Sequence, residues 1–61
     1  MIKQELVDAY IRIKKENNFT YDALVKLSGL TKSQIGLILT QDGNKISIDK
    51  MVEGLFNMGI S

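Results

Sequence analysis

The sequence predicts an all-α fold, and three observations support this prediction. The chain of 61 residues contains no proline, the residue that most often breaks a helix. Apolar residues recur every three or four positions along most of the chain, which is the period of an amphipathic helix. Residues that make good helix N-caps, Thr20, Thr31 and Ser47, stand just before apolar segments. We expect residues 1–61 to form a single domain, because so short a chain has one hydrophobic core at most.

The first helix is predicted from an apolar stripe near the N-terminus. Its members are Ile2, Leu6, Val7, Tyr10, Ile11 and Ile13. Arg12, Lys14 and Lys15 fall near its end, where positive charges complement the carbonyl end of the helix dipole. Asparagine tolerates left-handed backbone angles, so we expect Asn17 and Asn18 to end the helix.

A short second helix is expected over about 21–28. Thr20 is its predicted N-cap, and its buried face is predicted to consist of Leu24, Val25 and Leu27. Gly29 follows where helices commonly end with a positive φ angle, which glycine adopts without a Cβ clash. We expect Leu30 to pack inward.

Two further helices are predicted beyond this turn. Thr31 caps the third, whose apolar positions are Ile35, Ile38 and Leu39 and which should end near Gln41. Ser47 caps the last, which should stop at Gly59. The apolar face of the last helix is predicted to consist of Ile48, Met51, Val52, Leu55 and Met58.

A β-hairpin is the competing local interpretation. Asp42-Gly43 between residues 37–40 and 45–48 is a strong short-range hairpin signal. The caps at Thr31 and Ser47 and the apolar spacing that continues to Met58 favour helices instead.

Composition excludes several classes of function. With no cysteine and no histidine, the chain lacks disulfides and the commonest zinc ligands and general base. It also lacks a glycine-rich phosphate loop, so we expect neither an enzyme nor a bound cofactor or metal. No apolar run is long enough to cross a membrane and no signal peptide is evident, so the cytoplasm is the expected location. The net charge of +1 favours no class of partner.

The order of the second and third helices is typical of a helix-turn-helix, in which a tight turn joins two short helices. From Phe19 to Ile60 the chain resembles the Cro and phage-repressor type of helix-turn-helix domain, also called the XRE or lambda-repressor-like family. The matching positions are Phe19, Thr20, Leu24, Val25, Leu27–Thr31, Ser33, Ile35, Ile38, Gly43, Ser47, Ile48, Leu55 and Met58–Ile60. The resemblance implies a bundle of four or five helices. It also implies a transcriptional regulator that binds double-stranded DNA, usually as a dimer, with a recognition helix over about 31–41 in the major groove.

Carried over by position, the base-reading candidates are Thr31, Lys32, Ser33, Gln34 and Leu37. Lysine can donate to guanine, glutamine can pair with adenine, and hydroxyls can reach base edges or phosphate. Leucine can touch a thymine methyl group. The alternative interpretation of the polar positions is a helix cap followed by solvated side chains. The phosphate-binding candidates are Lys14, Thr20, Tyr21, Asn44 and Lys45. Each lysine taken singly also fits a solvated surface charge.

Three positions depart from the family pattern. Tyr21 replaces a common glutamine, Gly36 lies inside a helix at a cost of about 1 kcal/mol, and Leu37 stands where polar residues are usual. Leu37 and the low net charge also fit a protein-interaction module, such as a small phage or mobile-element factor that binds a repressor or host protein. Phe56, Met58 and Ile60 offer a homodimer contact, although we expect at least two of them to complete the core.

Overall fold

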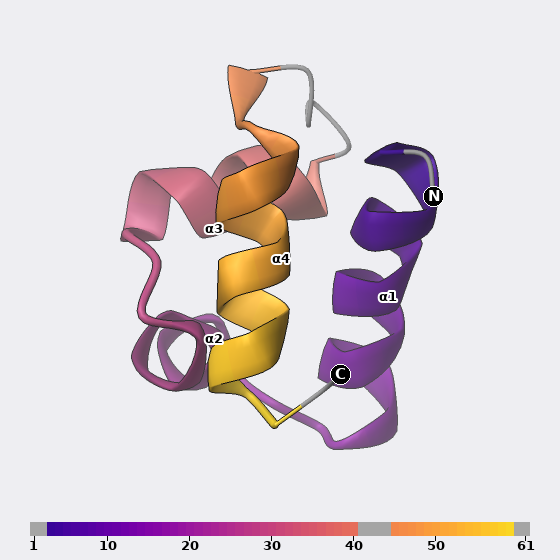
Figure 1. The fold of residues 1–61 in the computed structure, drawn as a ribbon. Coiled ribbons are helices and arrows are strands. Elements are labelled where there is room, and N and C mark those ends of the chain that lie inside the picture. The colour runs from indigo at the N-terminus through magenta and orange to yellow at the C-terminus, as the bar shows by residue number, and fades with distance from the viewer. Residues whose placement is uncertain (1–2, 41–44, 60–61) are drawn as a thin grey trace.

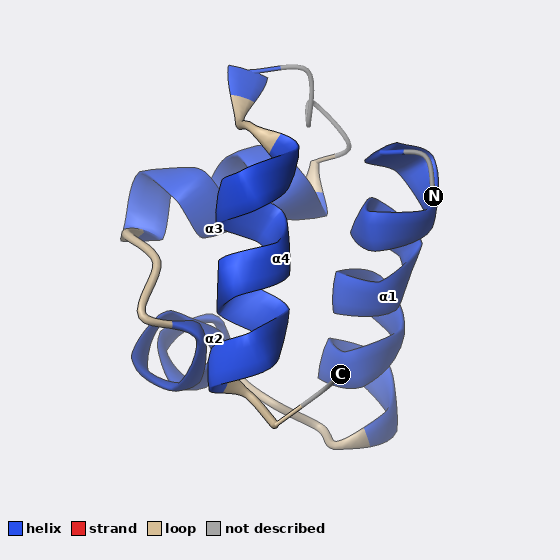
Figure 2. Ribbon diagram, in the orientation of Figure 1, coloured by secondary structure: helices blue, strands red, loops and turns tan. Residues whose placement is uncertain are grey.

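A computed structural model describes residues 3–40 and 45–59 of the chain. These residues form four α-helices: α1 (Lys3–Glu16), α2 (Tyr21–Ser28), α3 (Lys32–Leu39) and α4 (Ile48–Asn57) (Figure 1). Within the described ranges there are helices and loops but no strand (Figure 2). The predicted all-α class is therefore confirmed. The hairpin alternative is wrong, because residues 37–39 belong to α3 and α4 begins at Ile48.

The predicted N-caps are confirmed by their hydrogen bonds. The Thr20 hydroxyl accepts from the Ala23 amide at 3.1 Å, and the Thr31 hydroxyl accepts from the Gln34 amide at 3.1 Å. The Ser47 hydroxyl accepts from the Lys50 amide at 3.2 Å. Each cap satisfies one of the amides that the first turn of a helix leaves without a partner. These residues set where α2, α3 and α4 begin.

Left-handed residues follow three of the helices as expected: after α4, which ends at Asn57, the predicted stop Gly59 has a φ of 84°. Asn18, after α1, has a φ of 54°, and Gly29, after α2, has a φ of 74°. Helix α3 ends at Leu39, whereas the sequence predicted an end near Gln41, which lies outside the described residues. Thr40 closes it: its amide donates to the Gly36 carbonyl at 3.0 Å, and its hydroxyl donates to the same oxygen at 2.9 Å.

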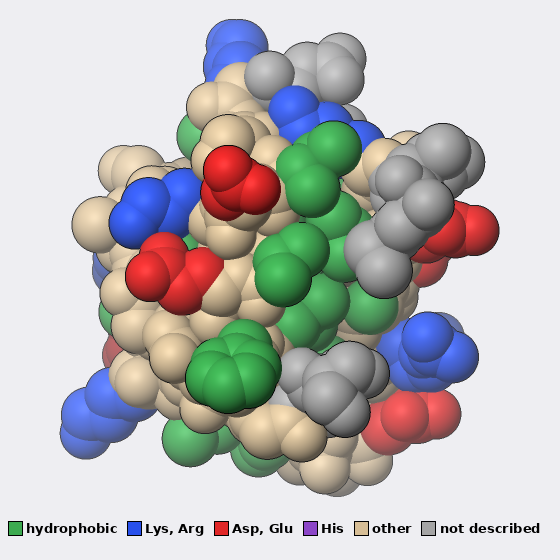
Figure 3. Space-filling model, in the orientation of Figure 1, with side chains coloured by type: hydrophobic (Ala, Val, Ile, Leu, Met, Phe, Trp, Pro, Cys, Tyr) green, Lys and Arg blue, Asp and Glu red, His purple; other side chains and the backbone are tan. Residues whose placement is uncertain are grey.

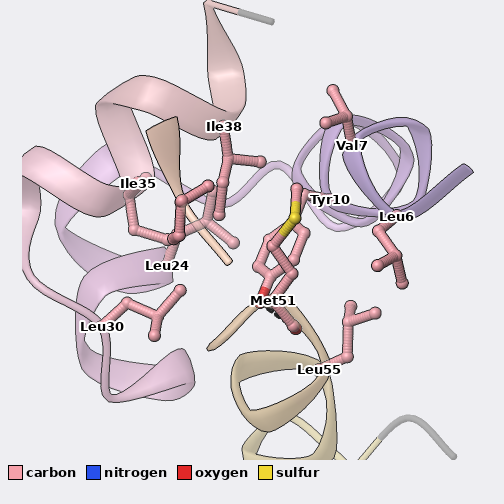
Figure 4. Close-up of a cluster of buried hydrophobic side chains, with 10 residues drawn as sticks. Leu6, Val7, Tyr10, Leu24, Leu30, Ile35, Ile38, Met51 and Leu55 are labelled. Atoms are coloured by element: carbon pink, nitrogen blue, oxygen red, sulfur yellow. Dashed lines mark hydrogen bonds between the residues drawn. The ribbon is translucent and has the colours of Figure 1, made fainter. Parts of the chain in front are cut away.

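The core lies where all four helices meet. Helix α4 packs against α1 and α2, and α3 packs against the same two helices. The fully buried members are Tyr10, Leu24, Ile35, Ile38 and Met51 (Figure 4). The core also takes in Leu30, which packs inward as predicted, together with Leu6, Val7, Ile46 and Leu55. In the described part of the chain, no helix has the length and apolar character needed to cross a membrane.

Tyr10 joins α1 to α4 within this core. Its hydroxyl donates to the Met51 carbonyl at 2.6 Å, and a Cβ on Gly54 would collide with that hydroxyl. Glycine at position 54 therefore lets the tyrosine approach the α4 backbone. Burial raises the pKa of Tyr10 to about 12, because the ionised phenolate loses its hydration in the core.

Some apolar residues predicted to be buried are exposed. Leu27 was placed on the buried face of α2, yet 45% of it is exposed. Ile48 and Val52 were placed on the apolar face of α4, and each is 44% exposed. The cause is geometric: in a bundle this small the apolar arc of a helix is wider than the strip that its neighbours cover. Phe56 is 73% exposed and Met58 packs partly buried against the core, while Ile2 and Ile60 lie outside the described residues.

Candidate nucleic-acid interface

Hydrogen bonds of Ser28 hold the turn between α2 and α3. Ser28 is fully buried, and its hydroxyl accepts from the Leu30 amide at 3.2 Å. The Asn57 side chain at the end of α4 donates to the Ser28 carbonyl at 2.8 Å. A Cβ on Gly29 would stand 3.1 Å from that same Asn57 amide nitrogen, so a larger residue would press on the Asn57 side chain as well as strain the left-handed backbone. Hydrogen bonds therefore hold the turn between α2 and α3, both within the turn and to the end of α4.

Thr31 and Gln34 form a closed capping box at the start of α3. The Gln34 amide donates to the Thr31 hydroxyl, and the Thr31 amide donates to Gln34 Oε1 at 2.9 Å. The spacing of threonine and glutamine three residues apart is the sequence signature of this motif. The box engages the glutamine oxygen, which a bidentate pair with adenine would also need. Gln34 therefore has a structural role, closing the capping box of α3, in addition to the base reading that the sequence predicts for it.

Tyr21 at the start of α2 contacts the start of α3. Its hydroxyl donates to the Lys32 carbonyl at 3.0 Å, and the Lys32 ammonium lies 6.0 Å from the centre of its ring. Tyr21 was expected to bind phosphate, but its one O–H already has this acceptor. The contact instead holds Lys32, a predicted base reader, next to the N-terminal end of α2.

Gly36 in α3 lies next to the hydroxyl end of the Tyr21 side chain. A Cβ at position 36 would stand 2.5 Å from the Tyr21 hydroxyl oxygen, closer than atoms of these kinds approach. The glycine that seemed unfavourable inside a helix therefore makes room for the tyrosine.

The outer face of α3 carries the predicted base readers. Thr31, Lys32 and Ser33 are exposed, while Ile35 and Ile38 point into the core. Gln34, Gly36 and Leu37 are partly exposed. None of the predicted base readers is buried against the bundle, so this end of α3 is open to a partner.

The first turn of α3 differs in charge from the other helix starts. Helices α1, α2 and α4 each carry an acidic residue in the first turn, namely Glu5, Asp22 and Asp49. The first turn of α3 has none and instead contains Lys32. The amides at a helix start carry partial positive charge, which here is left uncompensated by a carboxylate and is reinforced by an ammonium group. This end of the molecule suits an anionic partner.

The other phosphate candidates are spread over several elements. Lys14 is partly exposed near the end of α1, where its carbonyl accepts from the Phe19 amide at 3.0 Å. The Thr20 hydroxyl is engaged as the cap of α2. Lys45 is exposed just before Ile46, and Asn44 lies outside the described residues. Of this set, Tyr21 is the residue that the structure places against a predicted base reader.

A second exposed surface lies on α4. Ile48, Val52 and Phe56, spaced four residues apart, are all exposed, and we refer to them as the α4 stripe. Figure 3 shows hydrophobic side chains gathered over α4 and along the side that faces α1. The sequence interpretation missed this surface because it assigned two of the three residues to the core. Their spacing was visible, but not which face of the helix would stay uncovered.

Comparison with family models, with curated proteins and with solved structures finds no match to this chain. Among residues 3–40 and 45–59, no three acidic side chains come together in a way that could hold a metal ion. The chemistry of the candidate interface consists of exposed polar side chains at a helix start with a local positive charge.

Proposed function

We propose that the chain is a sequence-specific binder of double-stranded DNA, a transcriptional regulator of the phage repressor or Cro kind that acts in the cytoplasm and not as an enzyme. In this proposal α2 and α3 form a helix-turn-helix of the lambda-repressor-like type, and α3 is the recognition helix. One observation carries it: the first turn of α3 exposes Thr31, Lys32 and Ser33 together at a helix start that lacks an acidic side chain.

The chemistry of these groups suits the major groove. A lysine can donate to O6 and N7 of guanine, and a serine hydroxyl can donate to or accept from a base edge. The Tyr21 contact limits the freedom of α3 relative to α2, so less entropy would be lost when Lys32 meets a base. Sequence-specific contacts would thus come from the N-terminal half of α3.

Electrostatics predicts moderate affinity. With a net charge of +1, the chain as a whole attracts DNA weakly, and binding would depend on the few lysines that reach phosphates. Lys14 and Lys45, with Asn44, are the proposed phosphate contacts. The salt dependence of binding should therefore be smaller than for strongly basic regulators.

A homodimer would compensate for this weak single-site binding. We assign its contact to the C-terminal region, where Phe56 is exposed in line with Ile48 and Val52, and Met58 and Ile60 follow. These five side chains supply only part of the roughly 800 Å² per partner that a standard interface buries. The dimer should therefore be weak in solution and favoured when two half-sites on one duplex hold two copies close together.

Selection from a random duplex pool tests the proposal. We expect the wild-type chain to enrich a motif, and a Lys32→Ala, Ser33→Ala double variant to lose that enrichment while keeping its helical circular dichroism. Lys50→Ala is the matched control, because Lys50 is an exposed lysine on α4 that pairs with Glu53 at 3.1 Å. Enrichment that is equally strong with the double variant would contradict the assignment to α3.

A protein-interaction module is the second candidate, and the partly exposed apolar side chain of Leu37 favours it. In this alternative a repressor or a host protein binds α3. A Leu37→Asp variant should then lose a specific protein partner with no change in duplex binding. Salt separates the two functions as well, since DNA binding weakens as salt rises in proportion to the few phosphate contacts, whereas an apolar protein contact changes little.

A further inference from the structure

Helix α4 holds the turn between α2 and α3 at two points, one on each side of Gly29. Before the glycine, the Ser28 carbonyl accepts from Asn57 Nδ2 at 2.8 Å. After it, the Leu30 side chain lies so close to α4 that a Cβ on Gly54 would stand 3.1 Å from Leu30 Cδ1. Gly54 and Asn57 are three residues apart and therefore share one face of α4. That face is in contact with the turn that leads into α3.

The bond from Asn57 satisfies a carbonyl that α2 cannot satisfy by itself. Ser28 is the last residue of α2, and the last four carbonyls of a helix have no partner within it. Ser28 is also fully buried, so if its carbonyl lost the Asn57 donor, either water would have to enter or the turn would have to shift. Asn57 itself is exposed, so its contribution comes from this bond and not from buried apolar area.

A shift of the turn would reach the residues proposed to read bases. The Leu30 amide donates to the Ser28 hydroxyl at 3.2 Å, and the next residue, Thr31, caps α3. Lys32 and Ser33 follow directly in the first turn of that helix. Groups that recognise a ligand must be held within about 0.5 Å of their productive positions. A change of this size in the turn would therefore affect base reading even though all four helices stayed folded.

We propose that Asn57 is a positioning residue that holds the first turn of α3 in its base-reading position through the Ser28 carbonyl, an inference that rests on the proposed DNA binding. Asn57 acts from α4, outside the helix-turn-helix formed by α2 and α3, and makes no contact with DNA itself. The last turn of α4 then has a second role besides completing the core. Loss of the bond should weaken duplex binding by more than the change in protein stability explains.

A pair of asparagine variants tests this inference. Asn57→Ala removes the bond to the Ser28 carbonyl. Asn17→Ala is the matched control, because Asn17 is also exposed and its Nδ2 donates to the Ile13 carbonyl at 2.9 Å, at the end of α1. Each variant loses one bond from an exposed side chain to a carbonyl at a helix end, so both should lower the unfolding temperature by similar amounts.

Only Asn57→Ala should change the start of α3. In the free ¹⁵N-labelled protein, we expect the amide signals of Lys32 and Ser33 to move in Asn57→Ala and to stay in place in Asn17→Ala. For the duplex enriched from the random pool, the dissociation constant should rise about fivefold in Asn57→Ala. In Asn17→Ala it should remain that of the wild-type chain.

An unchanged dissociation constant in Asn57→Ala would overturn the inference while DNA binding stands. Equal weakening by both variants would also overturn it, because the loss of binding would then follow stability alone. Amide signals of Lys32 and Ser33 that do not move in Asn57→Ala would show that the bond does not position α3. If no duplex is enriched at all, the proposed function fails and the inference fails with it.

Discussion

The Tyr21 hydroxyl occupies the space that a Cβ on residue 36 would need, with 2.5 Å between the two positions. The same hydroxyl donates to the Lys32 carbonyl at 3.0 Å. Tyr21 and Gly36, which appear in the sequence as two separate departures from the phage-repressor pattern, are therefore one feature. The Tyr21 hydroxyl links α2 to α3 through its hydrogen bond to the Lys32 carbonyl, and glycine at position 36 leaves space for that hydroxyl.

Gly36→Ala should stabilise the protein in a Tyr21→Phe background but not in the wild-type background. In a Tyr21→Phe protein the added methyl group meets no hydroxyl, so it should stabilise the helix by up to about 1 kcal/mol. In the wild-type protein it displaces the tyrosine and breaks the bond to Lys32, which offsets this gain or exceeds it. Urea unfolding of the four proteins measures the coupling, which we expect to exceed about 0.5 kcal/mol. Equal stabilisation in both backgrounds would show that the two residues do not interact.

Gln34 variants separate the capping role from base reading. Gln34→Ala removes one bond of the capping box and should lower the free energy of unfolding by about 0.5 to 1 kcal/mol. Gln34→Glu keeps an acceptor for the Thr31 amide, so its stability should stay close to that of the wild type. Glutamate cannot donate to adenine N7, so a preference for adenine at one position would disappear in this variant. An unchanged base preference in Gln34→Glu would leave Gln34 with the capping role alone.

Tyr10 should make the protein less stable at alkaline pH. Its pKa is about 12 when folded and ordinarily 10.0, so both states are protonated below pH 10 and the contribution to stability is then complete. Between pH 10 and 12 the unfolded chain loses the proton that the folded protein retains. The free energy of unfolding should therefore fall by about 2 to 3 kcal/mol over this range.

Tyr10→Phe serves as the reference for this titration. It loses the bond to Met51 and should be about 1 kcal/mol less stable at neutral pH. Because phenylalanine does not ionise, the gap between the two proteins should narrow and then reverse as the pH rises from 10 to 12. Thermal or urea unfolding at stepped pH measures it. A constant gap across this range would mean that Tyr10 ionises with equal ease in both states.

The sequence predicted the local features of the fold well. Thr20, Thr31 and Ser47 are caps and Gly29 is a left-handed stop, because each of these roles depends on a residue and its immediate neighbours. Burial was less predictable. Leu24 and Leu27 are equally apolar, but Leu24 faces the other helices and Leu27 does not, and this depends on how the helices pack.

In the candidate site, too, features local to one helix were predictable from the sequence and contacts between helices were not. The exposure of Lys32 and Ser33 follows from helical periodicity, and the capping box was readable from the Thr31 to Gln34 spacing. The Tyr21 and Gly36 contact joins residues of different helices. Periodicity within one helix says nothing about such a contact, so only the three-dimensional structure could explain the glycine.

Lys14→Ala should weaken binding to all duplex sequences alike. A lysine that contacts one phosphate contributes about 0.9 to the slope of log K against log salt, so the slope should become shallower by about this amount. Lys50→Ala, on α4, should leave the slope unchanged. Fluorescence anisotropy with a labelled duplex at several salt concentrations gives both values. An unchanged slope for Lys14→Ala would remove Lys14 from the set of phosphate contacts.

If the first half of α3 is the surface that meets DNA, amide chemical shifts should locate the contact there. A ¹⁵N-labelled chain titrated with its enriched duplex should show the largest shift changes at residues 31–37, with smaller changes at the start of α2. Shift changes confined to Ile48, Val52 and Phe56 of α4, with 31–37 unaffected, would contradict a DNA contact at α3.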